Sequence, residues 1–113
     1  MSRAIESLLD FKKHGIRTFE KFGFYHVHLK DLLNYLQADE TQASEIIREN
    51  FIITNSLNFS DDPKEGLYIE EKGLYILMFD LESPLPEMRV YKMKCYELLY
   101  EKMKLREFKD NEN

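Results

Sequence analysis

The chain has one cysteine, three prolines and four glycines in 113 residues, and each scarcity removes a class of protein from consideration. Cys95 has no second cysteine with which to form an internal disulfide, so we expect a reducing, cytoplasmic setting. Apolar runs are far shorter than the roughly 20 residues that span a bilayer. Residues 1–10 carry charges where a signal peptide needs an apolar stretch. The sequence therefore predicts a soluble intracellular protein that does not bind membranes.

Residues that carry out catalysis or hold cofactors are also scarce. The four glycines are scattered and form no phosphate-binding loop, and the serine motifs of hydrolases and penicillin-binding enzymes do not occur. Cys95 lies among apolar residues of an expected helix, which is a poor setting for a thiolate nucleophile. His26 and His28 share one strand face, but a closed zinc site needs four ligands, so solvent-exposed or hydrogen-bonded histidines are the simpler interpretation. We predict no enzymatic activity, no cofactor and no metal.

Enough apolar sequence is present for a packed core, since hydrophobic residues make up 43% and charged residues 33% of the chain. This composition predicts one domain over residues 1–109 and a disordered tail over 110–113. Alternating and β-branched stretches predict strands at residues 16–21, 24–29, 51–54 and 66–71, with a loop over 55–65. Helical periodicity predicts helices from Ser2 to a stop at Gly15, then at 31–36, 39–50, 72–79 and 86–108. The predicted fold class is α+β, with a small antiparallel sheet covered by helices and a long C-terminal helix.

In the second strand, one face carries Tyr25, Val27 and Leu29 and is expected to point to the core. The other face carries the two histidines.

The apolar residues of the last helix form two stripes, which is more than one core contact requires. The second stripe consists of Met93, Tyr96, Tyr100 and Met103. Tyrosine and methionine are common at protein interfaces, so this stripe predicts a homodimer. The alternative is that the N-terminal helix folds back through Ile5, Leu8 and Leu9 and covers it.

Charge is unevenly distributed along the chain, although the net charge of −5 argues against binding nucleic acid by charge alone. Bases exceed acids by three in residues 10–30 and again in 86–109, so a basic surface for DNA is an open alternative. A helix-turn-helix over 31–50 belongs to that alternative, although its second helix carries acids beside Arg48. The candidate nucleic-acid contacts are Arg17, Lys21, His26, His28, Lys30 and Arg48.

The middle of the chain is acidic, with five more acids than bases in residues 57–85. An acidic surface there could steer association with a basic protein partner. The candidate partner contacts are Asp61, Asp62, Glu65, Glu70 and Glu71.

Four segments matter together: residues 15–18, residues 24–36, the segment 68–77 with its Gly-Leu-Tyr sequence, and the Pro-Glu pair at 86–87. The first three resemble the opening hairpin, the helix start that follows and the Gly-Leu-Tyr segment of the Bro N-terminal domain of phage antirepressors and large DNA viruses. The Pro-Glu pair at 86–87 and the helix after it resemble the next stretch of that family. The resemblance implies a phage or prophage regulator of transcription and is associated with DNA binding.

Within that class, the acidic net charge favours a protein target over DNA, and the absence of a catalytic constellation favours binding over catalysis. We expect a small antirepressor-type protein that binds stoichiometrically to a repressor or another host DNA-binding protein. Sequence-specific DNA binding is one alternative, and a DNA-mimicking inhibitor of a host defence nuclease is another.

Overall fold

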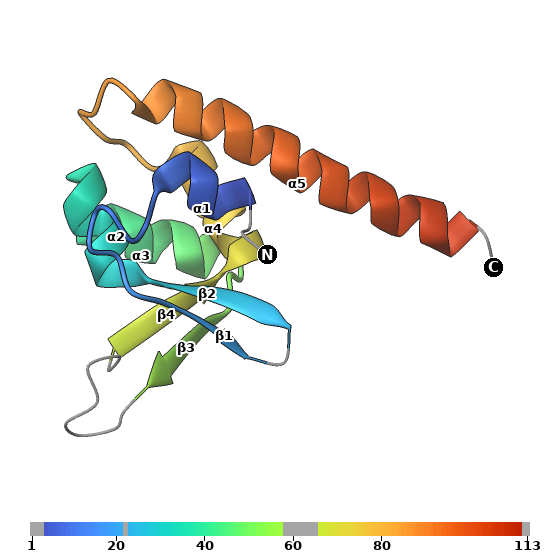
Figure 1. Ribbon diagram of the computed structural model, residues 1–113, viewed down its shortest axis with the longest axis horizontal. Helices are drawn as coiled ribbons and strands as arrows, with labels where there is room; N and C mark the ends of the chain where they lie inside the picture. Colours follow the sequence, from blue (N-terminus) through green and yellow to red (C-terminus); the bar gives the residue numbers. More distant parts are fainter. Residues whose placement is uncertain (1–3, 22, 58–65, 112–113) are drawn as a thin grey trace.

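The structure confirms the α+β class, with an antiparallel sheet packed against helices (Figure 1). It is a computed structural model that describes residues 4–21, 23–57 and 66–111. In chain order the elements are α1 (Ala4–Leu9), β1 (Thr18–Lys21), β2 (Phe24–His28), α2 (Leu29–Leu36), α3 (Glu40–Glu49), β3 (Thr54–Leu57), β4 (Gly66–Glu70), α4 (Glu71–Asp80) and α5 (Met88–Asn111).

The sheet has the strand order β1-β2-β4-β3, so β2 and β4 are central and β1 and β3 are edges. Val27 of β2 lies opposite Ile69 of β4, and both side chains are fully buried in the core. Tyr25 and Leu29 are buried in the same core, as their alternation in sequence predicts. Figure 1 shows the helices on one side of the sheet, with α5 lying across them and continuing past the body.

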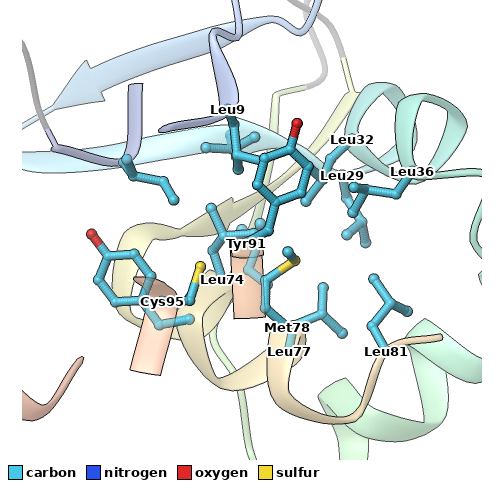
Figure 2. Close-up of a cluster of buried hydrophobic side chains, with 14 of the residues drawn as sticks. Leu9, Leu29, Leu32, Leu36, Leu74, Leu77, Met78, Leu81, Tyr91 and Cys95 are labelled. Carbon is cyan, nitrogen blue, oxygen red and sulfur yellow. The ribbon is translucent and has the colours of Figure 1, made fainter. Parts of the chain in front are cut away.

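Helix α4 is the centre of the core, because it contacts α3, α5, β2 and β4. Leu74, Leu77 and Met78 are fully buried in it, and Figure 2 shows them converging with side chains from α1, α2 and α5. Gly73 allows this close packing, since a Cβ there would lie 2.5 Å from Cγ2 of Ile52. The close approach of Ile52 therefore explains why the first residue of the Gly-Leu-Tyr segment is a glycine in this chain.

The first helix is shorter than predicted. Helix α1 ends at Leu9, Asp10 takes a positive φ of 46°, and a separate turn follows. Gly15 ends that turn instead of the helix, with a φ of 69°. The amide of Ile16 donates to the carbonyl of Phe11 and that of Gly15 to Lys12, which is the Schellman arrangement.

The same arrangement ends α2 and α3 without a glycine. Gln37 has a φ of 54° and Phe51 also has a φ of 54°, and in each case the amide of the next residue donates to the carbonyl five positions earlier. Ile52 N donates to the carbonyl of Ile47 at 3.0 Å, so the apolar run 51–53 closes α3. The prediction of a strand over these residues is wrong because this C-terminal turn uses them.

The third strand lies instead at Thr54–Leu57, where the polar sequence predicted the start of a loop. Its residues pair antiparallel with β4, Asn55 lying opposite Tyr68 and Ser56 opposite Leu67. Pairing with the central strand β4 outweighs the weak strand propensity of Asn and Ser. The remainder of the predicted loop, residues 58–65, lies outside the described residues.

Helix α5 begins at Met88, two residues later than the predicted start at Pro86, and continues to Asn111. The expected tail at 110–113 is therefore helical in its first two residues, and 112–113 lie outside the described residues. The molecule measures 47 × 33 × 30 Å along its principal axes, and α5 lies roughly along the longest of them (Figure 1).

Candidate functional site

One side of α5 anchors the helix to the body. Met88, Tyr91, Cys95 and Leu99 are each at most 8% exposed and belong to the core cluster. Figure 2 shows Tyr91 and Cys95 among the side chains of this cluster. The hydroxyl groups of Tyr91 and Tyr35 lie 2.7 Å apart, and burial raises the pKa of Tyr91 above its usual value. Burial also raises the pKa of the Cys95 thiol to about 12, so this cysteine stays protonated and is a poor nucleophile.

The second stripe of α5 has no cover in the described part of the chain. Its four side chains are 52–61% exposed, and we call them the α5 seam: Met93, Tyr96, Tyr100 and Met103. Their spacing of three, four and three residues is that of the a and d positions of a heptad repeat. Large apolar side chains in this pattern are typical of a surface that contacts another helix.

The alternative in which the N-terminal helix covers this stripe is wrong. Helix α1 does contact α5, but Ile5 and Leu9 are fully buried in the core cluster that holds Tyr91 and Cys95. Leu8 is partly buried against the same cluster. The N-terminal helix therefore packs on the body-facing side of α5 and leaves the α5 seam exposed.

The body extends the α5 seam on one flank. The ring of Phe79, at the end of α4, lies 5.8 Å from the ring of Tyr96 between centroids. These two rings border a shallow hollow of about 480 Å³, which Lys92, Met93 and Glu97 also line. Lys92 Nζ donates to the Phe79 carbonyl at 3.1 Å, which ties α5 to the end of α4 here. Sequence analysis missed Phe79 and Lys92, because the first belongs to a helix predicted as core and the second is an ordinary surface base.

A second cluster lies on the outer face of the sheet, the face opposite the helices. The ring of Phe19 stacks on that of His26 at 4.3 Å and 4°, and it meets Tyr68 edge-on. His26 Nδ1 lies 3.0 Å from the Phe24 carbonyl, which can only accept, so Nδ1 carries the proton. Nε2 then accepts from the Asn55 amide at 3.1 Å. Both ring nitrogens of His26 thus have hydrogen-bond partners within the sheet.

His28 has an equally structural role. Its Nδ1 accepts from the amide of Asp31 at 3.2 Å, which makes His28 the N-cap of α2. Its ring packs edge-on against Tyr68 and lies so close to Gly66 that a Cβ there would be 2.2 Å from Nε2. Both histidines are 4% exposed, so the structure corrects the expectation that they contact nucleic acid.

Asp31 also binds Arg17, another of the predicted nucleic-acid contacts. Arg17 donates to its carboxylate through Nε at 2.7 Å, through Nη2 at 3.0 Å and through the backbone amide at 3.0 Å. These hydrogen bonds lower the pKa of Asp31 and raise that of Arg17. The charge of Arg17 is therefore largely compensated within the chain.

Two of the other predicted nucleic-acid contacts, Lys30 and Arg48, lie on helices and not on the sheet. Lys30 is exposed near the start of α2, and Arg48 is exposed near the end of α3 between Glu45 and Glu49. The side chain of Lys21 lies outside the described residues. Acidic neighbours beside Arg48 oppose contact with a phosphate backbone.

The predicted acidic partner surface is only partly described. Glu71 is 8% exposed, and its carboxylate accepts a short hydrogen bond from the hydroxyl of Tyr75. Glu70 lies on the outer face with Oε1 3.9 Å from His26 Nε2. Glu71 thus faces its own chain, which corrects its assignment to a partner surface. Glu70 is partly exposed, and its assignment stays a prediction. Asp61, Asp62 and Glu65 lie outside the described residues.

The described residues contain no group of three or more His, Cys, Asp or Glu side chains placed to hold a metal ion. Within the same ranges, none of the helices combines the length and the apolar character needed to cross a bilayer.

Compared with protein-family models, with curated proteins and with solved structures, the chain matches none of them. The resemblance to the Bro N-terminal domain therefore stays a prediction that its motifs carry.

Proposed function

We propose that this protein is a small regulator that acts by stoichiometric binding to another protein, with the α5 seam as its binding surface. The antirepressor class follows from the motif resemblance, and the target is a repressor or another host DNA-binding protein. The observation that carries the proposal is the α5 seam itself, four large apolar side chains more than half exposed on a helix that continues past the body.

The chemistry of the α5 seam indicates the kind of partner surface. Heptad spacing presents a narrow apolar line, which an amphipathic helix can match with its own apolar side chains. Tyrosine contributes a large contact area with few rotatable bonds, and methionine adapts to an irregular partner. An amphipathic helix of the target is therefore the expected contact.

The described charges favour a protein target over DNA. Two of the six candidate nucleic-acid contacts are buried histidines, and a third, Arg17, is ion-paired with Asp31. We expect no band shift of a duplex below about micromolar protein at physiological salt. Non-specific DNA binders have dissociation constants of roughly 10⁻⁴–10⁻⁶ M under these conditions, so a band shift at lower protein concentration would indicate specific binding of DNA.

A photo-crosslinking amino acid placed at position 96 tests the proposal, with the same group at the exposed Glu101 as the matched control. In cells of the host, position 96 should form an adduct with a second, different protein, and position 101 should not. The adduct is identified by mass spectrometry, and the binding is then repeated with both proteins purified. Tyr96→Glu should weaken that binding at least tenfold, whereas Glu101→Lys should leave it within twofold. Loss of binding with Glu101→Lys alone, or adducts at 96 only with nucleic acid, would contradict the proposal.

A further inference from the structure

We infer that the α5 seam is self-complementary and pairs antiparallel with the α5 seam of a second copy, about a two-fold axis that passes between Tyr96 and Tyr100. The inference rests on the proposed role of the α5 seam as a binding surface. The partner that it places on this surface is a second copy of the same chain.

The residue order of the α5 seam reads the same from both ends. Methionine occupies the outer positions 93 and 103, and tyrosine occupies the inner positions 96 and 100. In an antiparallel pair, an a position of one helix lies beside a d position of its partner. Met93 then meets Met103 of the second copy and Tyr96 meets Tyr100, so each layer joins side chains of one kind.

Charges at the two ends of the α5 seam select the direction of pairing. Continuing the heptad, the position four residues before Met93 is Arg89, and the position four residues after Met103 is Glu107. Antiparallel pairing brings each arginine position opposite a glutamate position of the second copy. Parallel pairing brings arginine to arginine and glutamate to glutamate, which is repulsive.

The flanks are compatible with this direction. Glu97 lies near the proposed axis and would approach its own copy, but Lys94 Nζ is 3.3 Å from its carboxylate and compensates the charge. Lys92, on the other flank, is held by the Phe79 carbonyl.

The shape of the molecule leaves room for antiparallel pairing. The body packs on the first part of α5, and the helix then continues past it (Figure 1). In an antiparallel pair, the body of each copy lies beside the free part of the other helix. The two bodies therefore occupy opposite ends of the assembly and do not compete for space.

The area of the α5 seam predicts a weak dimer. A fully buried aromatic side chain covers about 150–250 Å², so Tyr96 and Tyr100, which are 61% and 57% exposed, can contribute roughly 120 Å² each, and the smaller methionines contribute at most a similar area. Four such side chains on each of two copies give about 1,000 Å², the lower bound of a specific interface. We therefore expect a dissociation constant on the order of micromolar.

Light scattering coupled to gel filtration tests the pairing between about 5 and 200 µM protein, the range that brackets a micromolar constant. The unmodified chain should change from monomer to dimer across this range. Tyr96→Glu and Tyr100→Glu should each remain monomeric and keep the circular dichroism of the parent, because both side chains face solvent in the monomer. Glu101→Lys, on a neighbouring exposed position, should dimerise like the parent. A monomer at 200 µM would overturn the inference.

Cysteine crosslinking tests the direction in a Cys95→Ala background. Met93→Cys mixed with Met103→Cys should give a disulfide-linked dimer on mild oxidation, and Met93→Cys alone should not. Efficient crosslinking of Met93→Cys with itself would overturn the antiparallel direction.

Charge reversal tests the register independently. Arg89→Glu and Glu107→Arg should each weaken the dimer several-fold, and the double variant should restore it. Failure of the double variant to recover would contradict the proposed pairing of these positions.

These outcomes separate the inference from the proposed function. A strictly monomeric chain that still crosslinks a different protein at position 96 overturns the dimer and leaves the proposed function in place. A chain that crosslinks only to itself supports the dimer and overturns binding of a different protein.

Discussion

Phe51 has a strained backbone conformation that a substitution can relieve. Phe51 takes the left-handed conformation at the end of α3, where glycine is the preferred residue, and its side chain is 90% exposed. The left-handed conformation costs a side-chain-bearing residue about 1–2 kcal/mol, and almost no packing offsets that cost at this exposed position.

Phe51→Gly should therefore stabilise the protein. The relieved strain exceeds the extra unfolded-state entropy of glycine, which leaves a net gain of about 0.5–1 kcal/mol. Thermal unfolding should show a rise of a few degrees. Ile53→Gly is the matched control, because Ile53 is also exposed but has no positive φ, and it should lower the melting temperature.

Asp31 makes stability depend on pH in the acid range. Hydrogen bonds from Arg17 lower its pKa in the folded protein, so the unfolded chain binds a proton at higher pH than the folded one. Stability from this group is present above the unfolded value near pH 4 and is lost as pH falls through the lower, folded value.

Asp31→Asn should cost roughly 1–2 kcal/mol at pH 7, since the variant loses a charged hydrogen-bond acceptor on a partly exposed arginine. Urea unfolding should show this gap narrowing as pH falls below about 4, because the parent then loses the same interaction. A gap of constant size from pH 7 to pH 2 would contradict the assignment.

At the scale of helices and strands, close packing of α4 accounts for the glycine in its first turn. Alanine usually stabilises a helix relative to glycine, by about 1 kcal/mol. At position 73, however, the added methyl group would overlap Cγ2 of Ile52, whose β-branched side chain has little rotational freedom.

Gly73→Ala should consequently destabilise the protein by about 1–3 kcal/mol through overpacking. Ile52→Ala removes the opposing methyl group, so adding Gly73→Ala to that variant should be neutral or stabilising. Chemical denaturation of all four combinations gives the coupling between the two positions. Simple additivity would show that the contact does not determine the choice of glycine.

Periodicity located β2, α3 and α5 because each combines a regular apolar pattern with a clear boundary, such as Asp39 before α3 or Pro86 before α5. It failed at residues 51–57, where β-branched residues close a helix and Asn and Ser form a strand. Local propensity could not show this, because the pairing of β3 with β4 decides it.

The second buried face of the sheet was missed for a similar reason. Alternation identifies two faces of a strand but does not show that both are covered. His26, His28 and Tyr68 are buried on the outer face by contacts that come from β1, β3 and the start of α2. The α5 seam was found from the sequence because a second apolar stripe on one helix exceeds what a single core requires.

For the whole molecule, self-association should couple to stability. The proposed dimer requires two folded chains, so a higher protein concentration favours the folded state. The melting temperature should rise measurably between 10 and 200 µM protein, and Tyr96→Glu should abolish that dependence. Differential scanning calorimetry at the two concentrations makes the measurement, and a parent melting temperature that does not change with concentration would contradict the coupling.

In the proposed dimer, the register of the paired α5 helices sets the distance between the two bodies. With the axis between Tyr96 and Tyr100, the starts of the two α5 helices are 20 residue positions apart along the paired helices, or about 30 Å at 1.5 Å per residue. A shift of the pairing by one heptad would change this separation by about 10 Å. In the proposed dimer, the layers of methionine and tyrosine therefore fix the register of the two helices, and with it the spacing and the opposite orientation of the two identical bodies.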